Sequence, residues 1–274
     1  MTRGNQRWPN VFKDSRRNRL ALASPHPTYP NPTIVQVACE ITFASQSDVR
    51  LTAGLLFPSF ASEFPEIAPI AGGTIQLVMG QPSFAPEAPP QQPPAAAFRF
   101  STESDARFVQ LSKNNFIYQT HEAYPGWADY RAKLLELWAK SSVLLAPTAI
   151  VKLGLRYINR IPKTGQHKAL VDWLQTTPDV PGALLTSKEH FLGRVESSPA
   201  PSHLRLVTVA NAVPTPDAPE GAIIFDIDRI ATEQLPVSAA AISEKLDVLH
   251  EDIWNSFNTA SSPLLKAYLS GSIR

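Results

Sequence analysis

The chain has 274 residues, a formal net charge of +1 at pH 7, and 43% hydrophobic against 18% charged residues. This length and composition are typical of a globular protein with a sizeable core, and the near-neutral total requires neither a nucleic acid nor an anionic membrane as partner. The single cysteine, Cys39, excludes an intrachain disulfide and a cysteine-rich metal site.

Proline is the unusual residue. The chain has 26 prolines against 12 glycines, about twice the usual proline share. No apolar run reaches the roughly 18 residues of a membrane span, and the first residues lack the apolar stretch of a signal peptide. We therefore expect a cytoplasmic protein with no membrane partner, and nothing in the pattern indicates a cofactor.

The near-zero total hides a charge asymmetry, because residues 1–19 hold six basic side chains against the single Asp14. These 19 residues carry +5, so the remainder carries −4. The six basic residues are Arg3, Arg7, Lys13, Arg16, Arg17 and Arg19. We interpret residues 1–30 as a solvated basic arm with a proline-rich connector; the alternative is an arm that binds phosphate or an acidic partner, with Trp8 and Phe12 as anchors.

The first half of the chain predicts strands followed by a long helix. Residues 34–43 alternate as a half-buried strand does, with Cys39 toward the core and Glu40 on the polar face. Six prolines in residues 82–94 predict a loop. The other predicted elements are a short helix over 57–64, strands over 74–79, 98–102, 107–111 and 115–119, a helix over 126–145 with an apolar stripe, and a strand over 149–161.

The second half repeats this order. Its predicted elements are a short helix over 168–174, strands over 190–196, 204–210 and 222–230, a long helix capped by Ser238, and a last helix starting at Ser262 and Pro263. The pattern predicts an α+β fold, mostly antiparallel, as two sheets or one sheet with helices on one side. We expect two pseudo-duplicated halves, residues 31–161 and 162–274, packed as one domain.

Charged residues on three strands are the candidate binding site. Period two places Arg156 and Arg160 on one face of their strand, opposite Tyr157 and Asn159. Asp226 and Asp228 share a face of another strand, and Glu40 lies on the polar face of the first. If the strands are neighbours, the arginines can pair with the carboxylates across the sheet as an ion network. The alternative is a divalent-metal site for phosphoryl transfer.

The histidines show no spacing typical of metal ligands. His250 adjoins the apolar stripe of the last long helix, where it can pair with Asp247 or Glu251. No serine or cysteine has a base in a recognisable arrangement, so hydrolase and acyl-transfer functions have no support. Trp127 and Trp138 are better explained as core anchors than as cofactor platforms.

Several segments together resemble a sporadically distributed prokaryotic protein family of about this length to which no activity is assigned. They are Asn31-Pro32, the strand ending Cys39-Glu40-Ile41-Thr42-Phe43, Tyr124-Pro125-Gly126-Trp127, residues 155–161, 225–228 and 250–257. The resemblance covers roughly residues 31–260, with Gln36 and the long basic arm as departures. Its patchy distribution implies an accessory component, as found in mobile or defence-related gene neighbourhoods.

The sequence therefore favours a non-enzymatic binding or assembly subunit that presents its sheet face to a protein partner or to a second copy of itself. The resemblance adds the expectation that it belongs to a defence-associated complex. A first alternative is nucleic-acid or nucleotide binding through the basic arm and the Arg156/Arg160 strand. A second alternative is a metal-dependent nucleotide enzyme on Asp226, Asp228 and Glu40.

Overall fold

The computed structural model describes residues 26–44, 48–71, 95–186, 191–216 and 218–273. The basic arm, the predicted loop over 82–94 and the predicted strand over 74–79 lie outside these residues. Among the described residues, no helix has the length and apolarity needed to cross a membrane.

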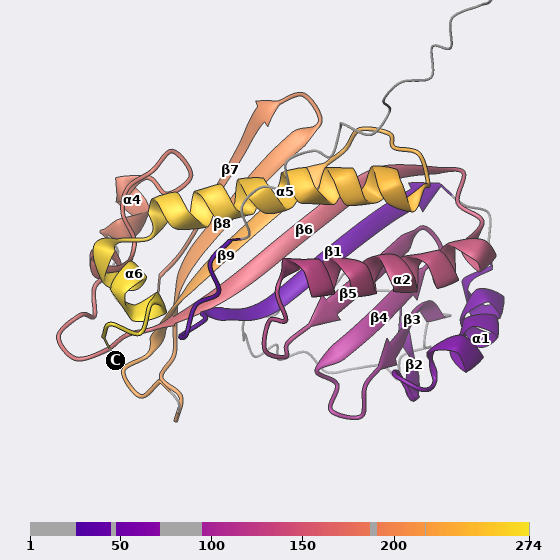
Figure 1. The fold of residues 1–274 in the computed structure, drawn as a ribbon, viewed down its shortest axis with the longest axis horizontal. Coiled ribbons are helices and arrows are strands. Elements are labelled where there is room, and N and C mark those ends of the chain that lie inside the picture. Colours follow the sequence, from indigo (N-terminus) through magenta and orange to yellow (C-terminus); the bar gives the residue numbers. More distant parts are fainter. Residues whose placement is uncertain (1–25, 45–47, 72–94, 187–190, 217, 274) are drawn as a thin grey trace, which may run out of the picture.

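All nine strands of the described residues form one antiparallel sheet in the order β2-β3-β4-β5-β1-β6-β9-β8-β7 (Figure 1). This confirms the α+β prediction and favours one sheet over two. The strands are β1 (Ile34–Ala44), β2 (Glu66–Ala71), β3 (Ala95–Ser101), β4 (Arg107–Ser112), β5 (Asn115–Thr120), β6 (Ala149–Pro162), β7 (Leu192–Ala200), β8 (His203–Ala212) and β9 (Ala222–Ala231).

The long helices lie on one face of this sheet (Figure 1). Trp138 of α2 packs against Phe43 and Phe116, and Phe257 of α5 stacks on Phe225, so both helices cover the side of the sheet that holds the core. The helices are α1 (Val49–Phe60), α2 (Trp127–Leu145), α3 (Leu170–Trp173), α4 (Gly182–Leu185), α5 (Ala239–Ala260) and α6 (Pro263–Leu269).

Sequence alternation explains this one-sided core. In β1, Val37, Cys39, Ile41 and Phe43 are buried, whereas the intervening residues are only half-buried. In α2, the predicted stripe is buried from Tyr130 to Leu145. The central strands thus have an apolar face under the helices and a mixed face on the other side, whereas β7 has no buried residue.

The two halves share one topology. In the first half, β1 precedes α1, the strands β3, β4 and β5 form a meander that ends beside β1, and α2 follows. In the second half, β6 precedes α3 and α4, the meander β7, β8 and β9 ends beside β6, and α5 follows. The halves meet where β1 pairs antiparallel with β6. The order of elements is thus similar in the two halves, with β2 as an extra strand in the first half.

The predicted helix over 57–64 is wrong in its bounds, because α1 spans Val49–Phe60. Asp48 caps it by accepting hydrogen bonds from the amides of Arg50 and Leu51. Pro58 lies in the last turn of α1. Leu51 and Leu55 are exposed at 64% and 56%, so the apolar residues of α1 do not follow one clean stripe. The four-residue helix α4 was not predicted.

Candidate binding face

The face of the sheet opposite the helices carries the predicted candidate residues. The order β1-β6-β9 makes the three strands neighbours, as that prediction required. Tyr157 and Asn159 are buried on the helix side, so Arg156 and Arg160 share the uncovered face. On the same face of β6, Gly154 is paired with Glu40 of β1 and Ile230 of β9. A Cβ at this glycine would lie 3.8 Å from the Glu40 Cβ and 3.9 Å from Ile230 Cγ1.

Arg156 and Asp226 form the central ion pair of this face. Arg156 donates from Nε and Nη2 to the two carboxylate oxygens of Asp226, at 2.8 and 2.6 Å. This pair joins β6 to β9 with the bidentate geometry that arginine and carboxylate favour. Only 10% of the Asp226 side chain is exposed, so the carboxylate is both desolvated and neutralised. The predicted cross-strand ion network therefore exists at this position.

Glu40 pairs with lysine rather than with arginine. Its Oε1 lies 2.8 Å from the Lys152 Nζ, and it accepts a hydrogen bond of 2.7 Å from the Asn115 side chain. These partners come from β6 and β5, which flank β1 on either side. Arg160 lies farther along β6 and donates to the Thr215 hydroxyl. The five predicted strand residues thus share a face, but the two arginines do not share the three carboxylates.

Asp228 differs from the other two carboxylates of this face. Burial raises the pKa of Asp228 to about 6; Arg156 lowers it, while the neighbouring Asp226 and Glu40 raise it further. Within the described part of the chain, no cation lies within ion-pair distance of its carboxylate. Asp228 is a half-buried acid on the same face of β9 as Ile230.

The described residues contain no cluster of three or more histidine, cysteine, aspartate or glutamate side chains that could hold a metal ion. Both Asp226 oxygens already accept from Arg156, and Glu40 is bound by Lys152. The contacts of this face are those of cross-strand ion pairs.

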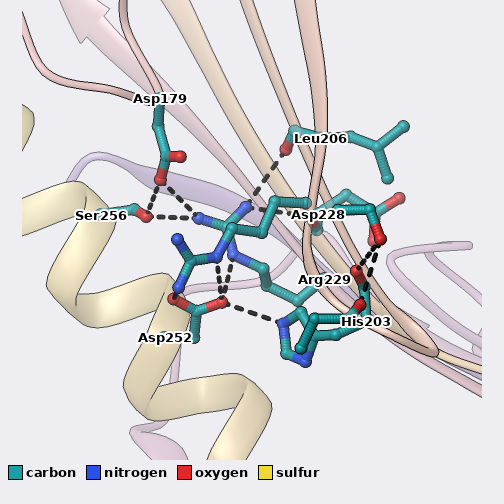
Figure 2. A network of polar contacts seen from close by, with 10 residues as sticks. Asp179, His203, Leu206, Asp228, Arg229, Asp252 and Ser256 are labelled. Carbon is teal, nitrogen blue, oxygen red and sulfur yellow. Dashed lines mark hydrogen bonds and ion pairs between the residues drawn. The ribbon is translucent and has the colours of Figure 1, made fainter.

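A second polar cluster, which sequence reasoning missed, lies between β9 and α5 (Figure 2). Arg229 of β9 is fully buried on the helix side, where the alternation of β9 predicts an apolar residue. It contacts Asp252 at 2.9 Å, Asp179 at 3.0 Å and the Ser256 hydroxyl. Burial lowers the pKa of the Arg229 guanidinium, and the two carboxylates oppose that shift.

Asp252 of α5 contacts three basic side chains in this cluster. Arg205 of β8 donates to both of its oxygens, at 2.9 and 2.6 Å, and His203 lies 3.1 Å away. Burial raises the pKa of Asp252, but Arg229 and the donors on β8 outweigh this and lower it below its usual range. The cluster fixes α5 to two strands, and each charge in it has a partner.

A pocket of about 200 Å³ opens beside the start of α2. Its polar wall includes Arg107, Tyr118, Glu122 and Lys133. Glu63 bridges the two cations, at 2.7 Å from Arg107 and 3.0 Å from Lys133. These cations are therefore already neutralised by the chain itself.

His250 lies in an aromatic cluster and pairs with neither predicted carboxylate. Its ring stacks on Trp127 with centroids 4.2 Å apart. Asp247 instead accepts from Trp127 Nε1 at 2.7 Å and from Arg131, and Glu251 lies 3.1 Å from His26. Burial, with His26 and Arg131 nearby, lowers the pKa of His250 to about 3. His250 is a neutral core residue.

No protein-family model matches the chain, and no curated protein is significantly similar to it.

Proposed function

We propose that the chain is a non-enzymatic binding or assembly subunit that recognises a protein partner through the uncovered face of its sheet. The observation that carries this proposal is the one-sided architecture: α1, α2 and α5 all pack on the other face (Figure 1). The resemblance to a sporadically distributed family extends the proposal to an accessory subunit of a prokaryotic defence-associated complex.

The side chains of this face suit a protein partner. Half-buried isoleucines, among them Ile117, Ile158 and Ile230, stand between ion pairs that are already satisfied within the sheet. Asp228 adds a carboxylate without an ion-pair partner among the described residues. A partner that contributes apolar side chains and one lysine or arginine over Asp228 would match both properties.

The test is purification of the full chain from its native host, followed by reconstitution with each purified partner. Ile117→Arg introduces a charge on the uncovered face, and Val248→Arg, at a 51% exposed position of α5, is the matched control on the helix face. We expect binding to survive Val248→Arg and to weaken about tenfold or more with Ile117→Arg. Equal binding by both variants, or loss with Val248→Arg alone, would contradict the proposal.

The charge of residues 1–19 favours nucleic-acid binding as a second candidate function. Arg156 is engaged by Asp226 and Arg160 contacts Thr215, so this alternative depends on the arm. Binding through the arm should weaken steeply with salt and be lost on deletion of residues 1–19. An affinity for RNA or DNA that does not change with salt concentration, or that persists after the deletion, would exclude nucleic-acid binding through the arm.

A further inference from the structure

In the part of the chain that the structure describes, β7 lies at one end of the sheet and no strand pairs with its outer edge. Among the described residues, β7 pairs only with β8, and residues 194 and 196–200 are exposed. The other edge strand, β2, carries Pro69 in its middle, where the nitrogen cannot donate to a further strand. In β7 the only proline is Pro199, next to its last residue. The β7 edge therefore lacks the protection that β2 has.

The direction of the β7 backbone follows from its bonds to β8. The carbonyl of Phe191 accepts from the amide of Asn211 on β8, and the two strands stay in register through Ser197. Because antiparallel residues alternate in direction, residues 193, 195 and 197 also face β8. Residues 192, 194 and 196 then turn their N–H and C=O groups outward, where these groups can bond to another strand.

The similar strand order of the two halves points to the same position beside β7. β7 occupies in the second half the position that β3 occupies in the first, at the outer end of a meander that leads back to β6 or β1. β3 is paired on its outer side by β2, whereas no described strand of the second half corresponds to β2. The position beside β7 is thus one that this fold fills with an antiparallel strand elsewhere.

We infer that a second copy of this chain fills this position with its own β7, antiparallel and centred on Val195. The inference rests on the proposed assembly function and names the partner for this edge. The two-fold axis at Val195 places Arg194 opposite Glu196 of the second copy, and Glu196 opposite its Arg194. Both pairs of residues have outward backbone groups, so they are the hydrogen-bonded pairs of the new ladder.

The charges of β7 suit this register. Arg194 and Glu196 lie on the uncovered face, 3.6 Å apart within one chain, with 56% and 55% of their side chains exposed. Opposite charges on either side of a two-fold axis are self-complementary, so two exposed pairs form across the interface. Because the axis runs perpendicular to the sheet, the helices of both copies stay on one side. The two uncovered faces then form one continuous surface.

The test is sedimentation equilibrium of the full chain over a wide range of protein concentration, with two single charge reversals. Arg194→Glu and Glu196→Arg each set like charges opposite each other, and we expect each to raise the dimer dissociation constant about tenfold or more. Both positions are exposed, so the monomer should keep its fold. Lys168→Glu, at a 62% exposed position outside β7, is the matched control and should leave dimerisation unchanged.

Two combinations test the register itself. A mixture of the Arg194→Glu and Glu196→Arg proteins should form heterodimers, because opposite charges then face each other at both positions. The double variant R194E/E196R should recover the wild-type dimer. Three results would overturn the inference. They are a wild-type chain that is monomeric, a dimer dissociation constant that the single reversals leave unchanged, and a double variant that stays monomeric. The proposed function would fail separately, in the Ile117→Arg and Val248→Arg comparison made on monomeric Arg194→Glu protein.

Discussion

Arg229 shows how one buried charge holds a helix to the sheet. It has no exposed surface and contacts Asp179, Asp252 and Ser256, from a loop and from α5 (Figure 2). Arg205 shares Asp252 but keeps 32% of its side chain in water. A buried ion pair that loses one partner leaves the other as an uncompensated charge, whereas an exposed pair is replaced by water.

We therefore expect Arg229→Ala to lower the free energy of unfolding by about 3 kcal/mol, and Arg205→Ala by about 1 kcal/mol or less. Urea denaturation of both variants against the wild type checks this. Equal losses for the two variants would show that burial does not set the contribution of Arg229.

The raised pKa of Asp228 predicts that the stability of the fold depends on pH. Its pKa is raised to about 6 in the folded chain, from an ordinary value near 3.8. The folded state therefore holds its proton more tightly, and the stability that this contributes is present below about pH 4 and is lost as the pH rises through 6.

Asp228→Asn removes this titration. At pH 7.5 we expect the variant to unfold with a free energy higher by about 1 kcal/mol, less than the full shift implies because the half-buried side chain is partly hydrated. Near pH 4 the gain should vanish. Urea denaturation of Asp228→Asn and the wild type at both pH values measures this gain in the free energy of unfolding. An equal gain at each pH would mean that packing rather than charge is responsible.

At the scale of elements, α2 ends on a strained residue. Its C-cap, Ala146, adopts φ +43° and ψ +53°, the left-handed conformation that glycine accepts without steric cost. The residue is exposed, so its side chain contributes little packing. We expect Ala146→Gly to raise the free energy of unfolding by about 0.5 to 1 kcal/mol.

Ala132→Gly, at an exposed position in the middle of α2, is the control, and should lower the free energy of unfolding by about 1 kcal/mol. Thermal unfolding of both variants measures the difference. If Ala146→Gly also destabilises the chain, the left-handed cap carries no strain.

The elements that could be predicted from the sequence are those with one dominant period. The alternation of β1 and the stripe of α2 gave their location and their buried faces, and the shared face of Arg156 and Arg160 followed from period two alone. α1 was misplaced because exposed leucines and Pro58 obscure its pattern. Strand order was left open, since nothing local to β1 or β6 specifies that they pair.

Arg229 was missed for a related reason. Its partners Asp179 and Asp252 lie 50 and 23 residues away in the chain, and only the packing of α5 brings them together. An arginine at an apolar position of β9 was the available signal, because a charge on a core face needs buried partners.

At the scale of the whole molecule, the halves are joined in two layers. β1 pairs with β6 along most of their length, and above them Trp127 of α2 donates to Asp247 of α5. Asp247 also accepts from Arg131 of α2. The core residues of both halves form one continuous cluster. A half that unfolded alone would expose the buried side of the other, so the two should unfold together.

This cooperativity can be measured with the tryptophans as local reporters. Trp138 is buried in the first half and Trp173 in the second. In the chain labelled with 5-fluorotryptophan, ¹⁹F NMR gives each a separate signal, which Trp138→Phe and Trp173→Phe assign. We expect both signals to lose native intensity at the same urea concentration, because breaking the β1–β6 pairing exposes both cores. Separate midpoints for Trp138 and Trp173 would show instead that the two halves fold as independent units.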